Sequence, residues 1–549
     1  MMGTKARCFT PVPAVSLEEL VPADHFYRHL DRVLDLSFVR DLVQDCYAAS
    51  GRPSVDPVVF FRLQLVMFFE GIRSERLLMR TVTDRLSVRW FLGYNLDEPL
   101  PDHSSLTRIR TRYGLAVFRR FFEAIVEQCQ HAGLVWGREL YFDATHVLAD
   151  AAMDSLVPRF AVEARAAIHA HLDALFAEEP TPPEPPATPD PEQTEAAWPP
   201  TAAAPTSLPV ALSARERELL TAANAARHDW IAEAGHPQRE VHGLYQRTAD
   251  VRISTTDPDA TPLRLKGGGT HLGYQTHYAV DGGKKRIILG VLVAPGEVME
   301  HQPMLDQAWH VRFRFHLHPR QATGDTKYGT LENIRALDAM SIRAYMPLFD
   351  AWNRHPDYFG PAHFTYDAEQ DVYRCPQGQL LRPFRREYQA QKTEYRANAA
   401  TCNACPVKPA CTPGTQGRIV HRSFHAAVQE RVRVYQQTPA YEKAMRKRQV
   451  WVEPLFAEGK QWHGMRRFRL RRLWRVNSEA LLLATGQNLK RLLQQRGWGR
   501  RPFPGETAAA ANAFSVLRCW LVAVCDGGAA GYFRTLLPHL ATYHIQLAA

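Results

Sequence analysis

The spacing of hydrophobic residues predicts helices over the first quarter of the chain. From residue 14 to about 135, apolar side chains recur at helical spacing, as in the run 58–69. Residues that favour helix starts precede three of these runs, namely Ser16, the segment 53–56 and Asp102. The pattern therefore predicts an all-helical N-terminal domain over residues 1–135.

A different pattern begins at residue 139. Residues 139–143 form an apolar strand that is expected to end at Asp143. Beyond residue 250, predicted strands at 286–293, 321–325 and 342–346 alternate with predicted helices at 302–312 and 331–339. Because strand–helix–strand alternation builds a sheet covered by helices, the predicted fold class is α/β, with a mixed sheet flanked by helices.

Three further segments differ in composition. Residues 180–209 hold 11 of the 38 prolines, so the span 180–212 is predicted to be an extended, mobile linker between charged helical segments at 158–178 and 213–234. Residues 351–425 appear as an irregular stretch that holds four cysteines, and 426–497 as a long helical stretch with breaks. Residues 501–549 form a tail of no assigned role, in which 513–525 is expected to be a buried helix.

Bulk properties exclude several classes of protein. The 549 residues suggest two to four domains, and no apolar run reaches the roughly 20 residues that span a bilayer. No apolar stretch follows the basic N-terminus, so no signal peptide and no membrane partner are expected. Nine cysteines, an odd number, argue against a disulfide framework. A reducing, cytoplasmic compartment fits best.

Positive charge is concentrated near the end of the chain. Residues 418–501 contain 20 Lys/Arg and 5 Asp/Glu, a net charge of +15, which leaves −5 for the rest of a chain whose total is +10. Such asymmetry is typical of a polyanion partner, usually nucleic acid, although a solvated helical face is the alternative. A basic helix is predicted over 466–475. The candidate DNA-binding residues are Arg446, Arg448, Lys460, Arg466, Arg467, Arg469, Arg471, Arg472 and Arg475.

Two aspartates lie where predicted strands end. Asp143 closes the strand at 139–143, and Asp325 closes the strand at 321–325. In open α/β sheets, ligands bind at the edge where strands end, so the two carboxylates are candidates for a common site. Taken singly, each aspartate could instead cap a helix or form a turn.

Glu453 is the third candidate carboxylate. Arg446, Glu453 and Lys460 are spaced seven residues apart, which predicts that they share one helix face. A carboxylate between two cations suits a metal-bound phosphodiester, whereas surface salt bridges are the alternative. Pro454 follows the glutamate and is expected to break or kink the helix just after it.

Four cysteines form a candidate zinc site. Cys402 and Cys405 have the two-residue separation of a metal-binding thiolate pair, and Cys375 and Cys411 supply two further thiolates. Four thiolates fit a tetrahedral structural Zn²⁺. Reduced structural cysteines without metal are the alternative.

Several motifs, in this order, resemble those of a known family. They are Phe-Asp-Ala-Thr at 142–145 with small residues at 149–152, the segments 254–260 and 272–281, Gly-Asp-Thr-Lys-Tyr-Gly at 324–329, Cys-Pro-Gln-Gly at 375–378, Val-Glu-Pro-Leu-Phe at 452–456 with Lys460, and Asn-Leu-Lys-Arg-Leu at 488–492. The chain resembles bacterial insertion-sequence transposases of the DDE class over residues 20–495. It is most similar to the subgroup with a helical N-terminal domain and a cysteine-containing insertion.

The resemblance implies a fold, a reaction and a site. It implies an RNase H-like catalytic core, with two aspartates on neighbouring strands and a glutamate on a later helix. Asp143, Asp325 and Glu453 would then be catalytic and would hold Mg²⁺ or Mn²⁺ for cleavage at transposon ends and strand transfer into target DNA. A homodimer on DNA, associated with the nucleoid, is expected. The alternatives are an inactive or domesticated DNA-binding regulator and a metal-dependent nuclease of the same fold.

The glutamate motif departs from the wider superfamily pattern, which is Tyr-x2-Arg-x3-Glu-x6-Lys. Glu453 and Lys460 match it. Arg446 stands where the tyrosine would be and Gln449 where the arginine would be. The resemblance therefore carries over the roles of the glutamate and the lysine, and Arg448, one residue earlier, is the candidate for the arginine's role.

With the family in view, the chain divides into seven predicted parts. The helical domain at 1–135 would bind DNA or hold two copies together, and the sequence favours neither. The remaining parts are 136–179 (first part of the catalytic core), 180–212 (linker), 213–350 (a helix and the second part of the core), 351–425 (cysteine insertion), 426–500 (third part of the core, with the glutamate and the basic region) and 501–549 (tail).

Overall fold

The computed structural model describes residues 16–48, 54–159, 252–265, 268–348, 358–388 and 391–499, with single positions between 162 and 170. Its contacts separate residues 1–492 from residues 493–549, and the fold described below belongs to the first of these units. The predicted linker at 180–212, most of its flanking segments and the tail at 501–549 lie outside the described residues. No helix within the described ranges has the length and apolar character needed to cross a membrane.

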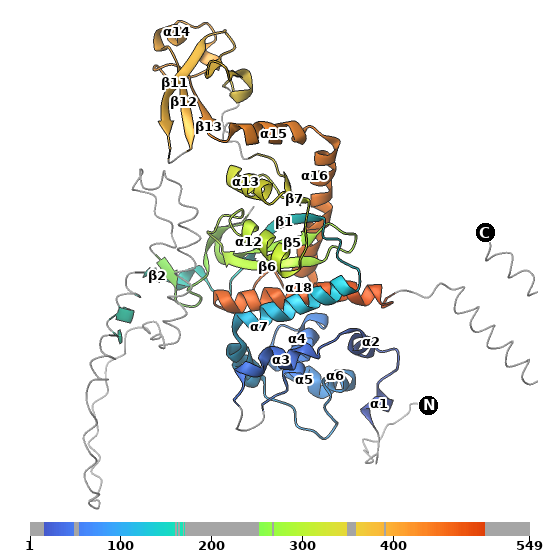
Figure 1. Cartoon of the computed structure of the whole chain (residues 1–549). Coiled ribbons are helices and arrows are strands. Elements are labelled where there is room, and N and C mark those ends of the chain that lie inside the picture. Colours follow the sequence, from blue (N-terminus) through green and yellow to red (C-terminus); the bar gives the residue numbers. More distant parts are fainter. Residues whose placement is uncertain are drawn as a thin grey trace, which may run out of the picture. The chain divides into compact units, whose positions relative to one another are not determined.

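The N-terminal region is helical, as predicted (Figure 1). Its three predicted helix starts are confirmed, because the side chains of Ser16, Asp56 and Asp102 each accept a hydrogen bond from a backbone N–H of the helix that follows. The helices are α1 (Leu17–Leu20), α2 (Phe26–Val33), α3 (Phe38–Val43), α4 (Pro57–Phe69), α5 (Glu75–Asp84), α6 (Leu86–Leu92) and α7 (His103–His131).

The centre of this region is an aromatic core around α4. Phe60 and Phe61 are fully buried, and the Phe61 ring stacks on Phe121 of α7 with a centroid distance of 3.9 Å. Helix α7 bends at Gly114, whose φ of +64° is accessible to glycine at little cost. Its second half reaches the end of helix α12 (Met304–Arg314), since the Gln130 side chain donates to the Phe315 carbonyl.

The main sheet is mixed, in agreement with the predicted fold class. Its strand order is β4-β5-β1-β7-β8, and β6 also pairs with β5. Strand β1 runs antiparallel to β5 and parallel to β7. The strands are β1 (Glu139–Leu148), β4 (Thr261–Arg264), β5 (Thr270–Asp281), β6 (Ile288–Pro295), β7 (Gln321–Thr323) and β8 (Arg343–Tyr345), with α12 (Met304–Arg314) and α13 (Leu331–Ala339) in the connections. A separate pair joins β2 (Leu156–Pro158) to β3 (Arg252–Ser254).

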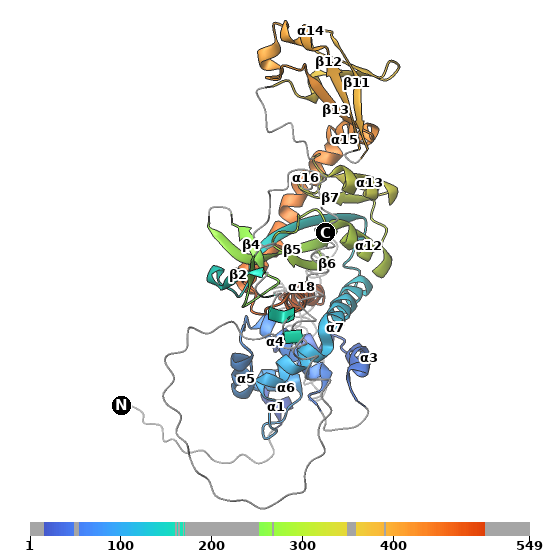
Figure 2. The ribbon, with the colours of Figure 1, turned by 90° about the vertical axis from the view of Figure 1, so that its left-hand side faces the viewer.

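Residues 358–425 correct the expectation of an irregular stretch, because they contain a five-stranded antiparallel sheet. Figures 1 and 2 show its longer strands side by side. The side chains of Thr393, Tyr395 and Ala397 are buried alternately with exposed or half-buried neighbours, which is the period of a strand. The many charged residues between them mask this pattern in the sequence. The strands are β9 (Thr365–Asp367), β10 (Val372–Arg374), β11 (Leu380–Glu387), β12 (Lys392–Ala397) and β13 (Ile419–Ser423), and a short helix, α14 (Ala399–Asn403), follows β12.

Four helices follow this sheet, and the last of them is hydrogen-bonded to the edge strand β6 through two asparagine side chains. They are α15 (Ala426–Gln436), α16 (Pro439–Trp451), α17 (Glu453–Trp462) and α18 (Leu473–Gln495). The Asn488 amide accepts from the Ile288 N–H at 2.9 Å and donates to its carbonyl at 2.8 Å. Asn477 makes the same pair of bonds to Val293, at 2.8 and 2.9 Å. These amides satisfy backbone groups that an edge strand otherwise leaves unpaired.

We predict that Asn488→Ala destabilises the protein, because it leaves two buried backbone groups of Ile288 without partners. Each unsatisfied group costs about 1–3 kcal/mol, so the free energy of unfolding should fall by about 2–6 kcal/mol in urea denaturation. Gln494→Ala, an exposed change on the same helix, should cost less than about 0.5 kcal/mol. Equal stability of the two variants would contradict a stabilising role for the Asn488 hydrogen bonds.

Candidate active site

The parallel pairing of β1 with β7 places two aspartates side by side. Glu139 is opposite Gln321 and Tyr141 is opposite Thr323. Two residues further along each segment are Asp143 and Asp325, so the same register brings their carboxylates to neighbouring positions. The expectation of two aspartates on neighbouring strands is met by Asp143, which lies on β1, whereas Asp325 lies two residues after the end of the neighbouring strand β7.

Asp143 does not end its strand, which corrects the sequence prediction. Strand β1 continues to Leu148 because its other edge stays paired with β5, from Asp143 opposite Tyr278 to Leu148 opposite Gly273. Asp325 does follow the end of β7, and its Oδ1 accepts the Lys327 N–H at 2.9 Å. The Asp143 carboxylate therefore lies in the middle of strand β1, and the Asp325 carboxylate lies in the turn that follows β7.

The surroundings of Asp143 make its charged form costly. Its side chain is only 14% exposed, and burial raises its pKa to about 6. Arg448, whose Nη1 lies 3.7 Å from Oδ1, and the Ala144 N–H lower the pKa, whereas the carboxylates of Asp325 and Glu300 raise it. Three carboxylates and one guanidinium thus lie within electrostatic reach of one another.

Glu300 and Tyr328 are members of this cluster that sequence reasoning missed. The Glu300 side chain is 10% exposed and accepts a bond from Lys327. The Tyr328 hydroxyl is buried with no hydrogen-bond partner among the described residues, and its pKa is raised far above its usual value by burial and then by Asp143 and Glu300. Glu300 enters from the connection between β6 and α12, and no periodic pattern links that connection to the aspartates.

Alternate side chains of β1 face helices α16 and α17. This face belongs to the odd-numbered residues of the strand, so Asp143 shares it with its neighbours. The contacts, in chain order, are Glu139 with Lys447 at 2.7 Å, Tyr141 with Trp451 at a ring distance of 6.5 Å, Asp143 with Arg448, and Thr145 with Lys460 at 2.5 Å.

Glu453 is the exposed first residue of α17. Because Lys460 lies two turns further along this helix and touches Thr145, Glu453 is on the helix face that is turned to β1. Across the described residues, however, no three His, Cys, Asp or Glu side chains are assembled as a metal site. The structure brings the two aspartates together, whereas Glu453 lies on the helix face turned to β1 and is not assembled with them into a metal site.

The predicted common helix face of Arg446, Glu453 and Lys460 is wrong. Helix α16 ends at Trp451 and α17 begins at Glu453, so Arg446 belongs to a different helix. Pro454 lies in the first turn of α17, where its missing N–H removes no intrahelical bond. The break therefore comes immediately before the glutamate, not after it.

The predicted basic helix at 466–475 is also wrong. Residues 463–472 form an irregular connection between α17 and α18. The Leu148 N–H donates to Arg466 and the Phe468 N–H donates to Leu148, which ties the connection to the end of β1. The Phe468 ring is buried against Tyr274, so it is part of the hydrophobic core.

The candidate DNA-binding residues fall into two groups. Several are used inside the protein: Arg469 contacts Glu75 at 3.3 Å, Arg471 contacts Asp150 at 2.9 Å, and the Arg472 N–H donates to Asp257. Arg448 and Lys460 contact β1, as described above, and Arg475 is half-buried. The exposed members are Arg446, Arg466 and Arg467, with Arg471 partly engaged.

The four cysteines gather around one small cavity. Cys375, Cys402, Cys405 and Cys411 line a space of about 30 Å³ at the end of the five-stranded sheet. They are free thiols, and burial followed by the nearness of the other three raises the pKa of Cys411, although Arg418 lowers it. The thiols at 375 and 402 begin tight turns, and Gly378, with φ of +76°, closes the first of them.

Two family models match parts of the chain. A transposase domain (DUF772) matches residues 15–112, which hold the N-terminal helices up to the first turns of α7. A transposase DDE domain matches residues 374–493, from the end of β10 through α18, and includes Glu453 and Lys460. No curated protein and no solved structure gives a match.

Both matched models describe transposase domains, and together they cover less than half of the chain. Their combination supports an insertion-sequence DDE transposase, a DNA-transposing enzyme of the nuclease type, as the resemblance implied.

We predict that the metal-free protein loses stability when the Asp143 carboxyl group ionises. Because its folded-state pKa of about 6 exceeds the usual 3.8, the stability that protonated Asp143 contributes is lost as the pH rises through about 6. In EDTA at pH 8, Asp143→Asn should therefore raise the free energy of unfolding by up to about 3 kcal/mol, and near pH 4 it should not. Asp154→Asn, an exposed change beyond β1, is the control. A destabilised Asp143→Asn at pH 8 would contradict the prediction.

Proposed function

We propose that this transposase cleaves DNA at transposon ends and transfers the freed strand into target DNA, with Asp143, Asp325 and Glu453 as its catalytic carboxylates. The observation that carries the proposal is the adjacency of Asp143 and Asp325 on paired segments of one sheet. Lys460 beside Thr145 supports the placement of Glu453 on the same side.

The proposal includes an RNase H-like catalytic core. A mixed sheet flanked by helices, two aspartates on neighbouring segments and a glutamate on a later helix are the features that the family resemblance implies. The five-stranded sheet would then be an insertion between the strands of this core and the helix that bears the glutamate.

The carboxylate pair suits a divalent cation. Mg²⁺ and Mn²⁺ prefer oxygen ligands, and one or two protein carboxylates commonly suffice for Mg²⁺. Burial, and then the carboxylates of Asp325 and Glu300, raise the pKa of Asp143, and a cation would offset these like charges. When bound, such ions activate water and stabilise the leaving oxygen of a phosphodiester.

The remaining residues would position DNA for two successive displacements. In the first, water attacks a phosphodiester at the transposon end, and the bond to the 3′ oxygen breaks to leave a 3′-OH. In the second, that 3′-OH attacks a phosphodiester of target DNA and releases its 3′ oxygen. Neither step needs a Ser or Tyr nucleophile. Arg446, Arg466 and Arg467, which are exposed, would bind backbone phosphates, and two copies of the chain would pair two DNA ends.

We predict that Asp143→Ala, Asp325→Ala and Glu453→Ala each lower strand cleavage by about 1,000-fold or more while DNA binding persists. The substrate is a duplex that carries the element's own ends, with Mg²⁺ or Mn²⁺, and gel analysis reports nicking. Glu332→Ala, an exposed change in the first turn of α13, is the matched control and should cleave normally.

The outcomes of this assay separate three functions. Cleavage retained in one variant removes that residue from the catalytic set. Binding without cleavage by the wild type would favour a DNA-binding regulator, and cleavage without strand transfer would favour a nuclease.

We also propose that the four-cysteine cavity binds a structural zinc ion. Four thiolates are a common ligand set for structural Zn²⁺. All four thiols line one cavity of about 30 Å³. Since no three of them are assembled as a metal site among the described residues, a zinc ion would draw the four side chains together. Burial and then the nearness of the other three cysteines raise the pKa of Cys411, and a bound metal would balance the charges of the four thiolates.

Elemental analysis of purified protein should find about one zinc per chain. The paired change Cys402→Ser and Cys405→Ser should remove it and lower the melting temperature. Cys46→Ser, a half-buried free thiol in the helical region, should leave the zinc content unchanged. A chain that carries no zinc after growth with zinc, and whose melting temperature is insensitive to chelators, would contradict this proposal.

A further inference from the structure

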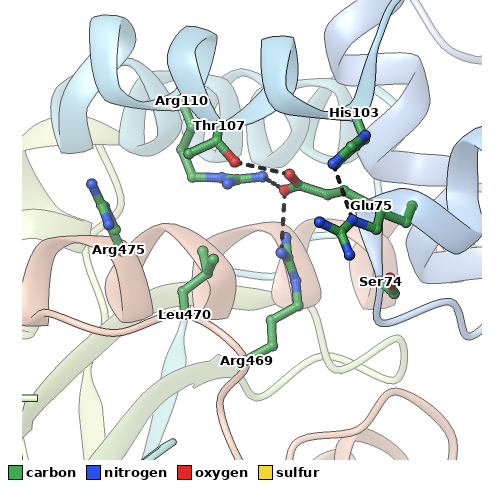
Figure 3. Close-up of a pocket in the computed structure, with 9 residues that line it drawn as sticks. Ser74, Glu75, His103, Thr107, Arg110, Arg469, Leu470 and Arg475 are labelled. Carbon is green, nitrogen blue, oxygen red and sulfur yellow. Dashed lines mark hydrogen bonds and ion pairs between the residues drawn. The ribbon is translucent and has the colours of Figure 1, made fainter. Parts of the chain in front are cut away.

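A cavity of about 350 Å³ is built jointly by the helical N-terminal region and the segment that leads into α18 (Figure 3). Helices α5 and α7 supply Glu75, Arg76 and Arg110, whereas Arg469 comes from the segment before α18 and Arg475 from the first turn of α18. The first group lies within the matched DUF772 transposase domain and the second within the matched DDE domain. The cavity therefore joins the two regions that match transposase domains.

Positive charge exceeds negative charge in this cavity. Leaving Arg475 aside, three guanidinium groups, those of Arg76, Arg110 and Arg469, line it together with one carboxylate, that of Glu75. Glu75 accepts hydrogen bonds from Arg110, Thr107 and Arg469, as Figure 3 shows, so both of its carboxylate oxygens are engaged. Glu479, which does not line the cavity, lies within electrostatic reach of Arg110 and Arg469. Two carboxylates against three guanidinium groups still leave a formal excess of positive charge.

Arg110 makes the excess costly. Its side chain is 2% exposed, and its Nε is buried without a hydrogen-bond partner in the part of the chain that the structure describes. Burying a charged donor without full pairing is unfavourable. An anion inside the cavity would lower this cost for Arg110 and its neighbours together.

Arg76 is held in place by a histidine. The Arg76 Nε donates to His103 Nε2 at 3.1 Å, and His103 Nδ1 lies 3.2 Å from an Asp102 oxygen. Since Nε2 accepts, the imidazole proton is on Nδ1 and points to Asp102. The other two nitrogens of the Arg76 guanidinium can donate to two oxygens of one ligand group, such as a phosphate.

We propose that this cavity binds one phosphodiester group of the bound DNA, so that a single phosphate is held by arginines from both matched regions. The proposal rests on the proposed function in that it takes DNA as the partner. It assigns Arg76 and Arg469 to the same phosphate, and it makes DNA a bridge between the helical region and the segment before α18.

A double-mutant cycle tests whether the two arginines share one phosphate. Binding of a duplex with the element's end is measured by fluorescence anisotropy in EDTA over a range of salt, for the wild type, Arg76→Gln, Arg469→Gln and the double variant. Neutralising one phosphate contributes about 0.9 to the slope of log K against log salt. The double variant should lose about 0.9, and its loss of affinity should be smaller than the product of the single losses. Arg119→Gln, an exposed change on α7 outside the cavity, should bind as the wild type does.

Two results would overturn the proposal. Multiplicative losses with a slope change of about 1.8 would mean two separate phosphate contacts. Variants that bind DNA as Arg119→Gln does would mean no contact in the cavity. Melting temperatures check that each variant folds, and Arg475→Gln replaces Arg469→Gln if the latter does not.

A second arm separates DNA from free anions. If inorganic phosphate raises the melting temperature of the wild type but not of the double variant, while DNA binding is equal in both, the cavity is a site for free phosphate only and the proposal fails. A wild type that binds no DNA at any salt would instead refute the proposed function itself, so the two failures are distinguishable.

Discussion

The parallel pairing between β1 and β7 is the constraint on which the candidate site depends. It sets Asp143 and Asp325 at matching positions, and the pairing of β1 with β5 on its other edge fixes the same register from the opposite side. A shift of one residue would turn the Asp143 side chain to the other face of the sheet. The contacts of α16 and α17 to alternate residues of β1 then bring Arg448 and Lys460, and the face that bears Glu453, to the same side.

Some arginines of the basic segment make bonds inside the protein, whereas others are exposed. Arg73 donates to the carbonyls of Gly464 and Arg467, and Glu479, which is half-buried, accepts the backbone N–H groups of Arg469 and Leu470. These bonds hold the connection between α17 and α18 against the helical region. Part of the basic segment that a charge count assigns to DNA is therefore structural, and under the proposed function the exposed remainder would bind the polyanion.

Much of the fold could be predicted from the sequence because local patterns determine it. Helix α13 has the predicted bounds, and the predicted caps at Ser16 and Asp102 are found. The connection at 463–472 could not be predicted, because its arginines favour helix and tertiary bonds, among them those to Leu148 and Glu479, keep it irregular. Glu300 was missed for a related reason, since only the folded chain brings its connection to the aspartates.

The most direct test of the central claim is where a divalent cation binds. Crystals of the protein soaked with Mn²⁺ and measured at the manganese absorption edge would locate the ion by its anomalous signal. The account predicts a peak between the carboxylates of Asp143 and Asp325, with the Glu453 side chain turned toward it. Manganese bound only elsewhere, with the two aspartates free of it, would contradict the account.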